Sequence, residues 1–143
     1  MAITQSVTTS FKLEALEGIH NLAVGGDTFK IALYAQSANL NSSTTVYSST
    51  GEISGTGYTA GGATLTNLGV TTSGTLAYSS WADVSWPGSV FTAAGALIYN
   101  ASKGNKTVAI LNFGGAYTAN GSLPYFTVTF PPNAPTTAII IFN

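Results

Sequence analysis

Alternating apolar and polar residues run through most of the chain, and this period-two pattern predicts short β-strands. It is clearest in TFKIALYA, residues 28–35, where Phe29, Ile31 and Leu33 fall on one face of the extended chain. Shorter segments of the same kind predict strands at 45–48, 63–70, 75–80, 81–86, 89–100, 107–113, 126–130 and 137–142. Turn signals such as Pro87-Gly88 separate them. This spacing predicts an all-β fold, an antiparallel β-sandwich or a jelly-roll-like barrel of about eight or nine strands.

One segment near the N-terminus follows a helical period instead. Phe11, Ala15 and Ile19 recur every four residues with Leu16 beside them, and this pattern predicts a short helix at about 10–19 with one apolar stripe. So short a helix is marginal alone, so we expect it to dock on the sheet or on a neighbouring subunit.

The segments around this helix define the domain organisation. Ser10 is the expected N-cap and Gly18 the expected end of the helix. Residues 1–9, rich in β-branched and hydroxyl side chains, are therefore expected to form an extended N-terminal arm, and residues 10–143 a single β-sandwich domain. The segment 36–62 is mostly Ser, Thr, Asn and Gly and predicts a long loop, a feature typical of functional or partner-contacting regions.

Charged side chains are scarce. They make up 6% of the chain, whereas a typical soluble protein has roughly 25%. The chain has no arginine, four lysines and a net charge of −1, so copies repel one another little and the surface favours association. Four scattered lysines do not form the basic patch that phosphate binding requires. The composition therefore indicates a subunit packed among others, with no nucleic acid as partner.

Targeting and redox signals are also missing from the sequence. The N-terminus lacks a basic region followed by an apolar run, so no secretory signal is expected. The longest apolar runs are short, as in AIIIF at 138–142, which predicts no membrane span and no membrane partner. The chain has no cysteine and therefore no disulfide framework.

Groups that could carry out catalysis are few. The chain has one histidine, His20, and no G-x-S-x-G nucleophile motif. His20 lies just past the predicted helix, where we expect it to complement the helix dipole. Glu52 and Asp83 are the only carboxylates of the β-rich region, and nothing brings them together as a glycosidase pair would require. Glu52 is expected to be solvated on the surface, and Asp83 to bond a neighbouring backbone or hydroxyl group.

Metal and cofactor sites are equally unsupported. One histidine without cysteine does not make a zinc site, and Asp27 lacks the acidic neighbours that calcium requires. None of the glycine pairs is followed by the Lys-Ser/Thr of a phosphate loop. We therefore predict that the protein is not an enzyme and has no catalytic residue, no metal and no cofactor.

Five residues are candidates for an interface. Trp81 and Trp86 are five positions apart, so on a continuous strand they point to opposite faces, one into the core and the other outward or at an interface. A sugar-stacking platform is the alternative interpretation of this pair. Ile3 and Val7 are the apolar side chains of the predicted arm, and Tyr58 lies in the long loop. An extended arm of this kind can add a strand to a neighbour's sheet edge.

Four segments carry a resemblance to a known family. They are SFKLEALEGIHNL, DTFKIALYAQSANL, EISGTGYTAGGATL and FTAAGALIYNASKGNKTVAILNFGG, and with the residues between them they cover the chain from about Thr9 to Ile141. In this order they resemble small virion structural proteins of tailed bacteriophages. The resemblance implies a phage or prophage origin and a place on the particle, and it supplies no catalytic residues.

Together, composition and resemblance favour a capsid decoration or cement protein. We expect it to be made in the bacterial host cytoplasm and to bind the exterior of the head shell, with the major capsid protein or other virion subunits as partners. A closed homo-oligomer, a trimer or dimer, is also expected. The alternative is a tail, baseplate or fibre-associated subunit that contacts host glycans through a tryptophan or the loop tyrosines.

Overall fold

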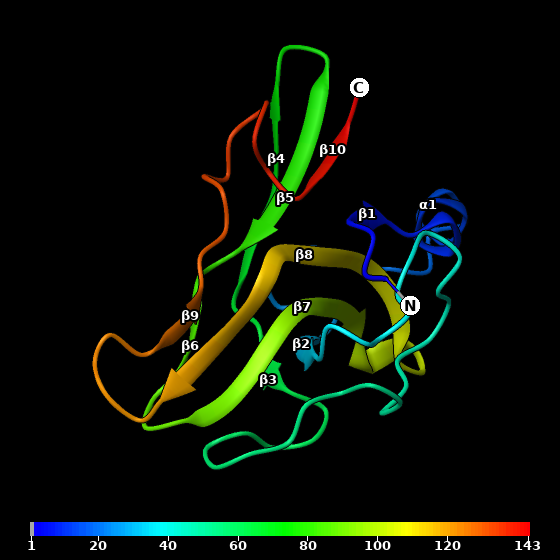
Figure 1. The fold of residues 1–143 in the computed structure, drawn as a ribbon. Coiled ribbons are helices and arrows are strands. Elements are labelled where there is room, and N and C mark those ends of the chain that lie inside the picture. The colour runs from blue at the N-terminus through cyan, green and yellow to red at the C-terminus, as the bar shows by residue number, and fades with distance from the viewer. Residues whose placement is uncertain (1) are drawn as a thin grey trace.

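The computed structural model describes residues 2–143, which contain three antiparallel sheets and one α-helix. The elements are β1 (Ser6–Val7), α1 (Thr9–Leu16), β2 (Phe29–Tyr34), β3 (Ala63–Thr64), β4 (Asn67–Ser73), β5 (Leu76–Trp81), β6 (Val84–Trp86), β7 (Val90–Asn100), the 3-10 turn η1 (Ala101–Lys103), β8 (Lys106–Asn120), β9 (Phe126–Val128) and β10 (Ile140–Phe142). The predicted all-β fold with one short helix is confirmed. Its strands form a five-stranded sheet β1-β8-β7-β2-β3, a three-stranded sheet β10-β5-β4 and the pair β6-β9 (Figure 1).

The hairpin of β7 and β8 forms the centre of the large sheet and bends sharply along its length. Ala93 pairs with Tyr117 and Gly95 with Asn112, so one intervening residue of β7 faces four of β8. The extra residues of β8 include Gly114, whose φ of 80° is readily adopted only by glycine. β8 therefore turns a corner, which is visible in Figure 1, and continues seven residues beyond Phe113, where the sequence pattern predicted its end.

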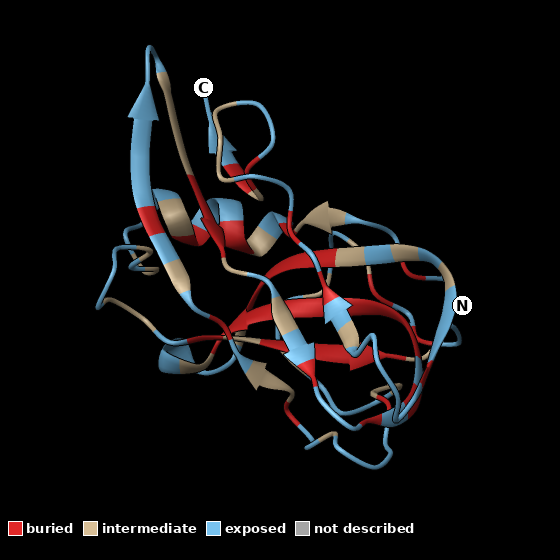
Figure 2. Ribbon diagram, turned by 90° about the vertical axis from the view of Figure 1, so that its left-hand side faces the viewer, coloured by how far each residue is buried: buried red, intermediate tan, exposed pale blue. Residues whose placement is uncertain are grey.

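The large sheet has a hydrophobic cluster on each face. Phe29, Ile31 and Leu33 of β2 pack in the first cluster, which also contains side chains of β5, β6, β9 and β10, so the three sheets share one core. Ala32 and Tyr34 point to the opposite face and pack in the second cluster. The alternation predicted for residues 28–35 is thus correct, but both of its faces are buried. Figure 2 shows buried residues concentrated in the middle strands of this sheet.

The second cluster is covered by the arm and the long loop of the same chain. Ile3 forms a bridge with Leu40 and is 8% exposed, while β1 pairs with β8 at Ala109 and Ile110. The segment predicted as a long loop has no regular strand, and only Val46 forms a bridge where a short strand was predicted. The arm and the loop therefore serve as a third layer over the large sheet.

The helix differs from its predicted pattern. Thr8, not Ser10, is the N-cap, and its Oγ1 accepts a hydrogen bond from the Phe11 main-chain N–H. Leu16, expected in the apolar stripe, is 83% exposed, whereas Glu14 is buried. Phe11 and Ala15 pack in the core as expected, so the stripe prediction is wrong for Leu16, and Glu14 turns inward to partners described below.

Both tryptophans are buried, so the prediction that one of them points outward is wrong. The chain turns between them, and Trp81 ends β5 whereas Trp86 ends β6. Trp81 is 1% exposed and packs against Phe29, with ring centroids 5.4 Å apart. Trp86 is 5% exposed and packs among aromatic rings. The rule that alternate residues point to opposite faces holds within one strand, and these two residues lie on different strands.

Candidate interaction groove

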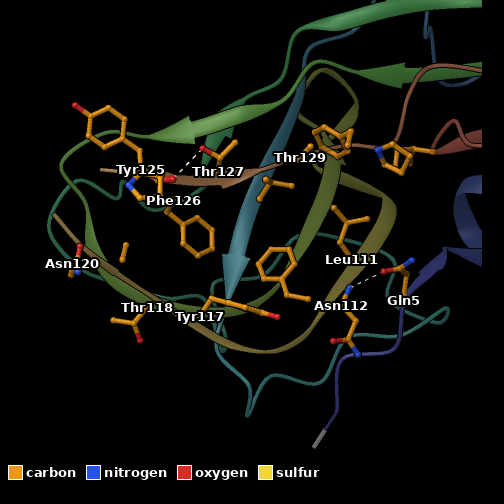
Figure 3. A pocket seen from close by; sticks show the side chains of 17 residues that line it. Gln5, Leu111, Asn112, Tyr117, Thr118, Asn120, Tyr125, Phe126, Thr127 and Thr129 are labelled. Atoms are coloured by element: carbon orange, nitrogen blue, oxygen red, sulfur yellow. Dashed lines mark hydrogen bonds between the residues drawn. The ribbon is translucent and has the colours of Figure 1, made fainter. Parts of the chain in front are cut away.

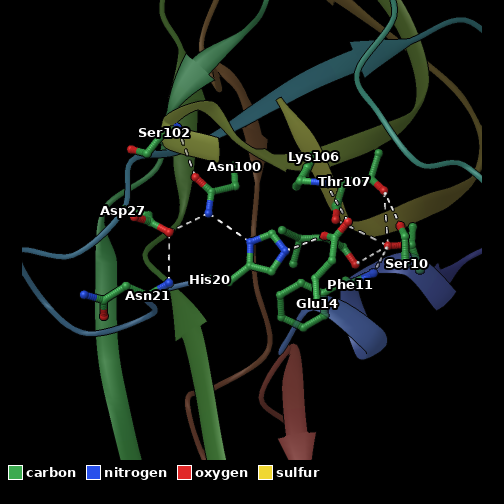
Figure 4. A network of polar contacts seen from close by, with 12 residues as sticks. Ser10, Phe11, Glu14, His20, Asn21, Asp27, Asn100, Ser102, Lys106 and Thr107 are labelled. Carbon is green, nitrogen blue, oxygen red and sulfur yellow. Dashed lines mark hydrogen bonds and ion pairs between the residues drawn. The ribbon is translucent and has the colours of Figure 1, made fainter. Parts of the chain in front are cut away.

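Polar side chains form two clusters in the fold, one around His20 and one around Glu52. The first is a network that joins α1 to the end of β7 (Figure 4). His20 has no exposed side-chain surface, and its Nε2 lies 2.7 Å from Glu14 Oε2. Asn100 Nδ2 donates to His20 Nδ1 (2.9 Å) and to Asp27 Oδ2 (2.7 Å). The two ring nitrogens of His20 thus contact the Glu14 carboxylate on one side and the Asn100 amide on the other.

Two lysines balance the two carboxylates of this network, since Lys106 pairs with Glu14 and Lys103 Nζ lies 3.8 Å from Asp27 Oδ1. Burial alone would raise the pKa of Glu14, but hydrogen bonds from His20 and Lys106 outweigh it and the pKa lies below its usual value. Lys106 Nζ lies 3.0 Å from Glu14 Oε1. Burial acts on Asp27 in the same direction, and bonds from the Asn21 N–H and the Asn100 amide likewise leave its pKa lowered. Both imidazole nitrogens are engaged, so His20 has no nitrogen free to act as a base.

The position of His20 thus has a different explanation from the one predicted. The side chain turns back into the protein and bonds Glu14 and Asn100, and it does not simply complement the helix dipole. The network links the helix, the loop that carries Asp27 and the end of β7. We interpret it as a structural clasp.

The second polar cluster surrounds Glu52. Its Oε1 accepts bonds from Tyr58 Oη (2.6 Å) and the Gly61 N–H (2.7 Å), and its Oε2 accepts one from Tyr47 Oη (2.6 Å). Burial and these bonds to a carboxylate raise the pKa of Tyr58 and Tyr47 above the usual tyrosine range. The expectation that Glu52 is solvated is wrong, because this one carboxylate fastens the long loop. Asp83 accepts a bond from the Phe130 N–H (2.8 Å), as expected for a backbone contact.

A surface groove lies elsewhere, between the far half of β8 and the segment around β9 (Figure 3). Its volume is about 580 Å³, within the size range of ligand and peptide sites. The lining residues share one property, the absence of any Asp, Glu, Lys, Arg or His. They are Gln5, Leu111, Asn112, Phe113, Tyr117, Thr118, Ala119, Asn120, Pro124, Tyr125, Phe126, Thr127, Val128, Thr129, Phe130, Pro131 and Ile139.

Aromatic rings form the apolar part of this groove. Phe126 of β9 packs against Phe91 of β7 (4.9 Å between centroids) and Phe113 of β8 (6.1 Å), which fixes β9 over the hairpin. Tyr117 and Tyr125 remain 55% and 42% exposed at the groove. Partly exposed tyrosines of this kind are enriched at protein interfaces.

Most polar side chains of the groove already have partners within the chain. Thr118 Oγ1 lies 2.8 Å from Thr92 Oγ1, and Thr127 Oγ1 lies 2.8 Å from Ser85 Oγ. Asn112 Nδ2 donates to the Ile3 carbonyl, and its Oδ1 accepts from Gly114. The groups left for a ligand are therefore those of the main chain and a few hydroxyls, among them Tyr117 Oη and Tyr125 Oη.

The main chain is indeed open along both sides of the groove. β8 pairs with β7 on one edge over most of its length. On the other edge it pairs with the two residues of β1 and, at Lys106, with Val46, and all of these contacts lie at the end away from the groove. β9 pairs with β6 on one edge, and within residues 2–143 no strand pairs with its other edge. Unpaired strand edges of this kind are templates for the addition of another strand.

The predicted interface residues lie outside this groove. Ile3, Trp81 and Trp86 are buried in the chain's own core, and Val7 and Tyr58 are half-buried. None of the five lines the groove. Their prediction rested on size and apolar character, which also mark core residues.

The residues that do form the groove, such as Tyr117 and Tyr125, were not predicted. One signal in the sequence points towards them, since no Asp, Glu, Lys or Arg occurs after Lys106.

Three further findings concern metal ions, membrane spans and known proteins. Across residues 2–143, His, Cys, Asp and Glu side chains do not come together in groups of three that could hold a metal ion. The helix found in that range is too short to cross a membrane. Comparison of the chain with known protein families, with curated proteins and with solved structures finds no match.

Proposed function

We propose that the chain is a structural subunit of a tailed-bacteriophage particle and, among particle parts, a decoration protein that binds and stabilises the exterior of the head shell. The observation behind a binding role is the uncharged groove, flanked by main-chain edges that are unpaired within residues 2–143. The assignment to a phage comes from the resemblance of the four quoted segments.

The distribution of charge supports a role in assembly. Between Glu52 and Lys103 the only charged residue is Asp83, and none follows Lys106. A surface without ionised groups avoids the large desolvation penalty that buried charges carry. The groove half of the molecule can therefore be covered by another protein at little electrostatic cost.

The groove supports a protein partner better than a sugar. Sugars are recognised by free polar side chains beside an aromatic ring, but Asn112, Thr118 and Thr127 are bonded within the chain. The tryptophans that could have formed a stacking platform are buried. Tyr117 and Tyr125 are the aromatic side chains left for such a contact.

Copy number in purified virions tests the proposal. A decoration protein should be present at near-stoichiometric amounts relative to the major capsid protein, as measured by gel densitometry and quantitative mass spectrometry. A few copies per particle would support the alternative of a tail, baseplate or fibre-associated subunit. Complete absence from particles of the phage that encodes the chain would overturn the proposal.

Binding to isolated head shells provides a second test. Purified protein should co-sediment with shells stripped of it. Tyr117→Lys should weaken that binding because it places a charge in the groove, whether the groove meets the shell itself or a second copy that binds the shell with it. Leu16→Lys adds the same charge to an exposed helix position outside the groove and serves as the matched control. Equal binding by all three proteins would show that the groove does not face the shell.

A further inference from the structure

A second strand edge without a partner lies away from the groove. β4 is the last strand of the three-stranded sheet and pairs only with β5. Its residues 70–73 are all exposed, and Val70 is 54% exposed. Figure 1 shows the β4–β5 hairpin projecting from the body on the side opposite to the β6–β9 pair. Figure 2 shows that most of β4 is exposed.

The second half of this edge carries little of the usual protection. Exposed edges in soluble proteins are normally interrupted by lysine, proline, an inward-pointing charge or a β-bulge. β4 reads NLGVTTS and has no charged residue or proline. Its one irregularity, a register shift between Asn67 and Val70, leaves residues 70–73 in regular pairing with β5. The far part of β8, residues 117–120, is regularly paired with β7 and equally uncharged.

We propose that β4 of one copy pairs edge to edge with residues 117–120 of β8 in the groove of a second copy. Each partner presents four regularly paired residues with a free outer edge. Strand addition would provide the main-chain hydrogen bonds that the groove's side chains do not offer. The exposed side chain of Val70 would meet the aromatic lining near Tyr117.

The observations favour a second copy over a different protein as the occupant. Both surfaces are preformed on the same chain, so pairing requires no rearrangement of either one. Both lack charge, so neither has to lose the hydration of an ion. Because they lie at different places in the molecule, the contact is head to tail, which gives a closed ring where the rotation between copies closes and an open filament where it does not.

The inference specifies the oligomer within the proposed particle subunit, and it is tested without any phage. The chain has no cysteine, so single-cysteine variants give unambiguous cross-links. Thr71→Cys and Thr118→Cys are prepared separately and then mixed. Oxidation, and a short bis-maleimide for registers outside disulfide range, should give a covalent dimer in the mixture and not in either variant alone.

Each alternative arrangement gives a different result. Cross-linking of Thr71→Cys with itself would mean that β4 pairs with β4, and cross-linking of Thr118→Cys with itself would mean that two grooves face each other. Either result overturns the proposal, as does a mixture that gives no dimer. A monomeric protein whose binding to head shells is lost in Tyr117→Lys would assign the groove to a shell protein.

A charge on the projecting edge provides an independent measurement. Val70→Lys should raise the dissociation constant of self-association at least about tenfold, measured by sedimentation equilibrium, because the ammonium would be buried against an uncharged surface. Leu16→Lys adds the same charge at an exposed apolar residue of the helix and should leave the dissociation constant unchanged. An unchanged constant in Val70→Lys would overturn the pairing. Presence in virions without the mixed cross-link would overturn this inference and leave the proposed function intact.

Discussion

The two ends of the β7–β8 hairpin differ in whether their polar groups find partners within the chain. At the end near Asn100 and Lys106, side chains of both charges bond one another inside the fold, and the main chain is capped by η1. At the end near Val90 and Asn120, charged side chains are absent and the outer main chain of β8 has no strand beside it. The first end is complete within one chain, whereas the second has bonding groups that only another molecule can satisfy.

The charged side chains are therefore unevenly distributed, and this distribution has one consequence for stability and another for association. The few ions of the chain are concentrated where they hold the helix and the long loop in place, through Glu14, Asp27 and Glu52. The surface around the groove is left free of them and is suited to association. The contrast makes stability depend on one end and assembly on the other, and variants at each end can separate the two.

The largest expected effect on stability is at the clasp. Asn100→Ala removes the amide that bonds His20 and Asp27. The buried His20 Nδ1 then loses its partner and Asp27 Oδ2 keeps only the bond from the Asn21 N–H, which should lower the free energy of unfolding by about 3 kcal/mol. Urea unfolding followed by circular dichroism measures it. Asn39→Ala, at an exposed position, is the control and should change little. Equal stability of both variants would contradict the role of the clasp.

A smaller loss is expected at the loop anchor. Glu52→Gln replaces a carboxylate that accepts three hydrogen bonds with a neutral amide of similar shape. We expect a loss of about 1–2 kcal/mol, together with faster hydrogen exchange in residues 47–61. Glu17→Gln removes the same charge from an exposed position and is the matched control. Unaltered exchange in the loop would show that Glu52 does not hold it.

Acidification should weaken the clasp end selectively. The pKa values of Glu14 and Asp27 are lowered in the folded state, so the unfolded chain binds more protons as the pH falls. Their contribution is fully present above the unfolded values of roughly 4 and is lost as the pH falls through the lower folded values. Stability should therefore rise with pH across this acidic range. Glu14→Gln should flatten the dependence, and an unchanged slope would contradict it.

The smallest effect on stability is expected in the groove. Tyr117→Ser changes a side chain that is more than half exposed, so the free energy of unfolding should change by no more than about 0.5 kcal/mol. Self-association should nevertheless weaken, because an aromatic contact of the groove is lost. Parallel unfolding and sedimentation measurements compare the two quantities. A large loss of stability would mean that Tyr117 belongs to the core.

The strands could be predicted from the sequence because their alternation is a local property. The pattern of residues 28–35, for example, follows from neighbouring residues alone. Burial of both faces of β2 could not be predicted, since it depends on a loop that contains few apolar residues. Glu14 likewise turns inward because of Lys106, a partner 92 positions away.

The groove escaped prediction for a related reason. It is defined by main-chain edges that lack neighbours, and sequence patterns indicate where strands lie but not which edge stays unpaired. Tyr117 and Tyr125 stand on either side of a turn, and only the bend of β8 brings β9 alongside it. The tryptophans were predicted as interface residues because they are large and apolar, and the same properties favour their burial in the core.

The long β7–β8 hairpin also has a mechanical consequence. One strand, β8, runs from the clasp to the groove, and β7 accompanies it through ten paired positions. A pull applied at the groove along the direction of β8 would load these cross-strand bonds in shear, so that they resist together and do not open one after another. Tension from a neighbour would thus be transmitted to the most deeply buried part of the fold.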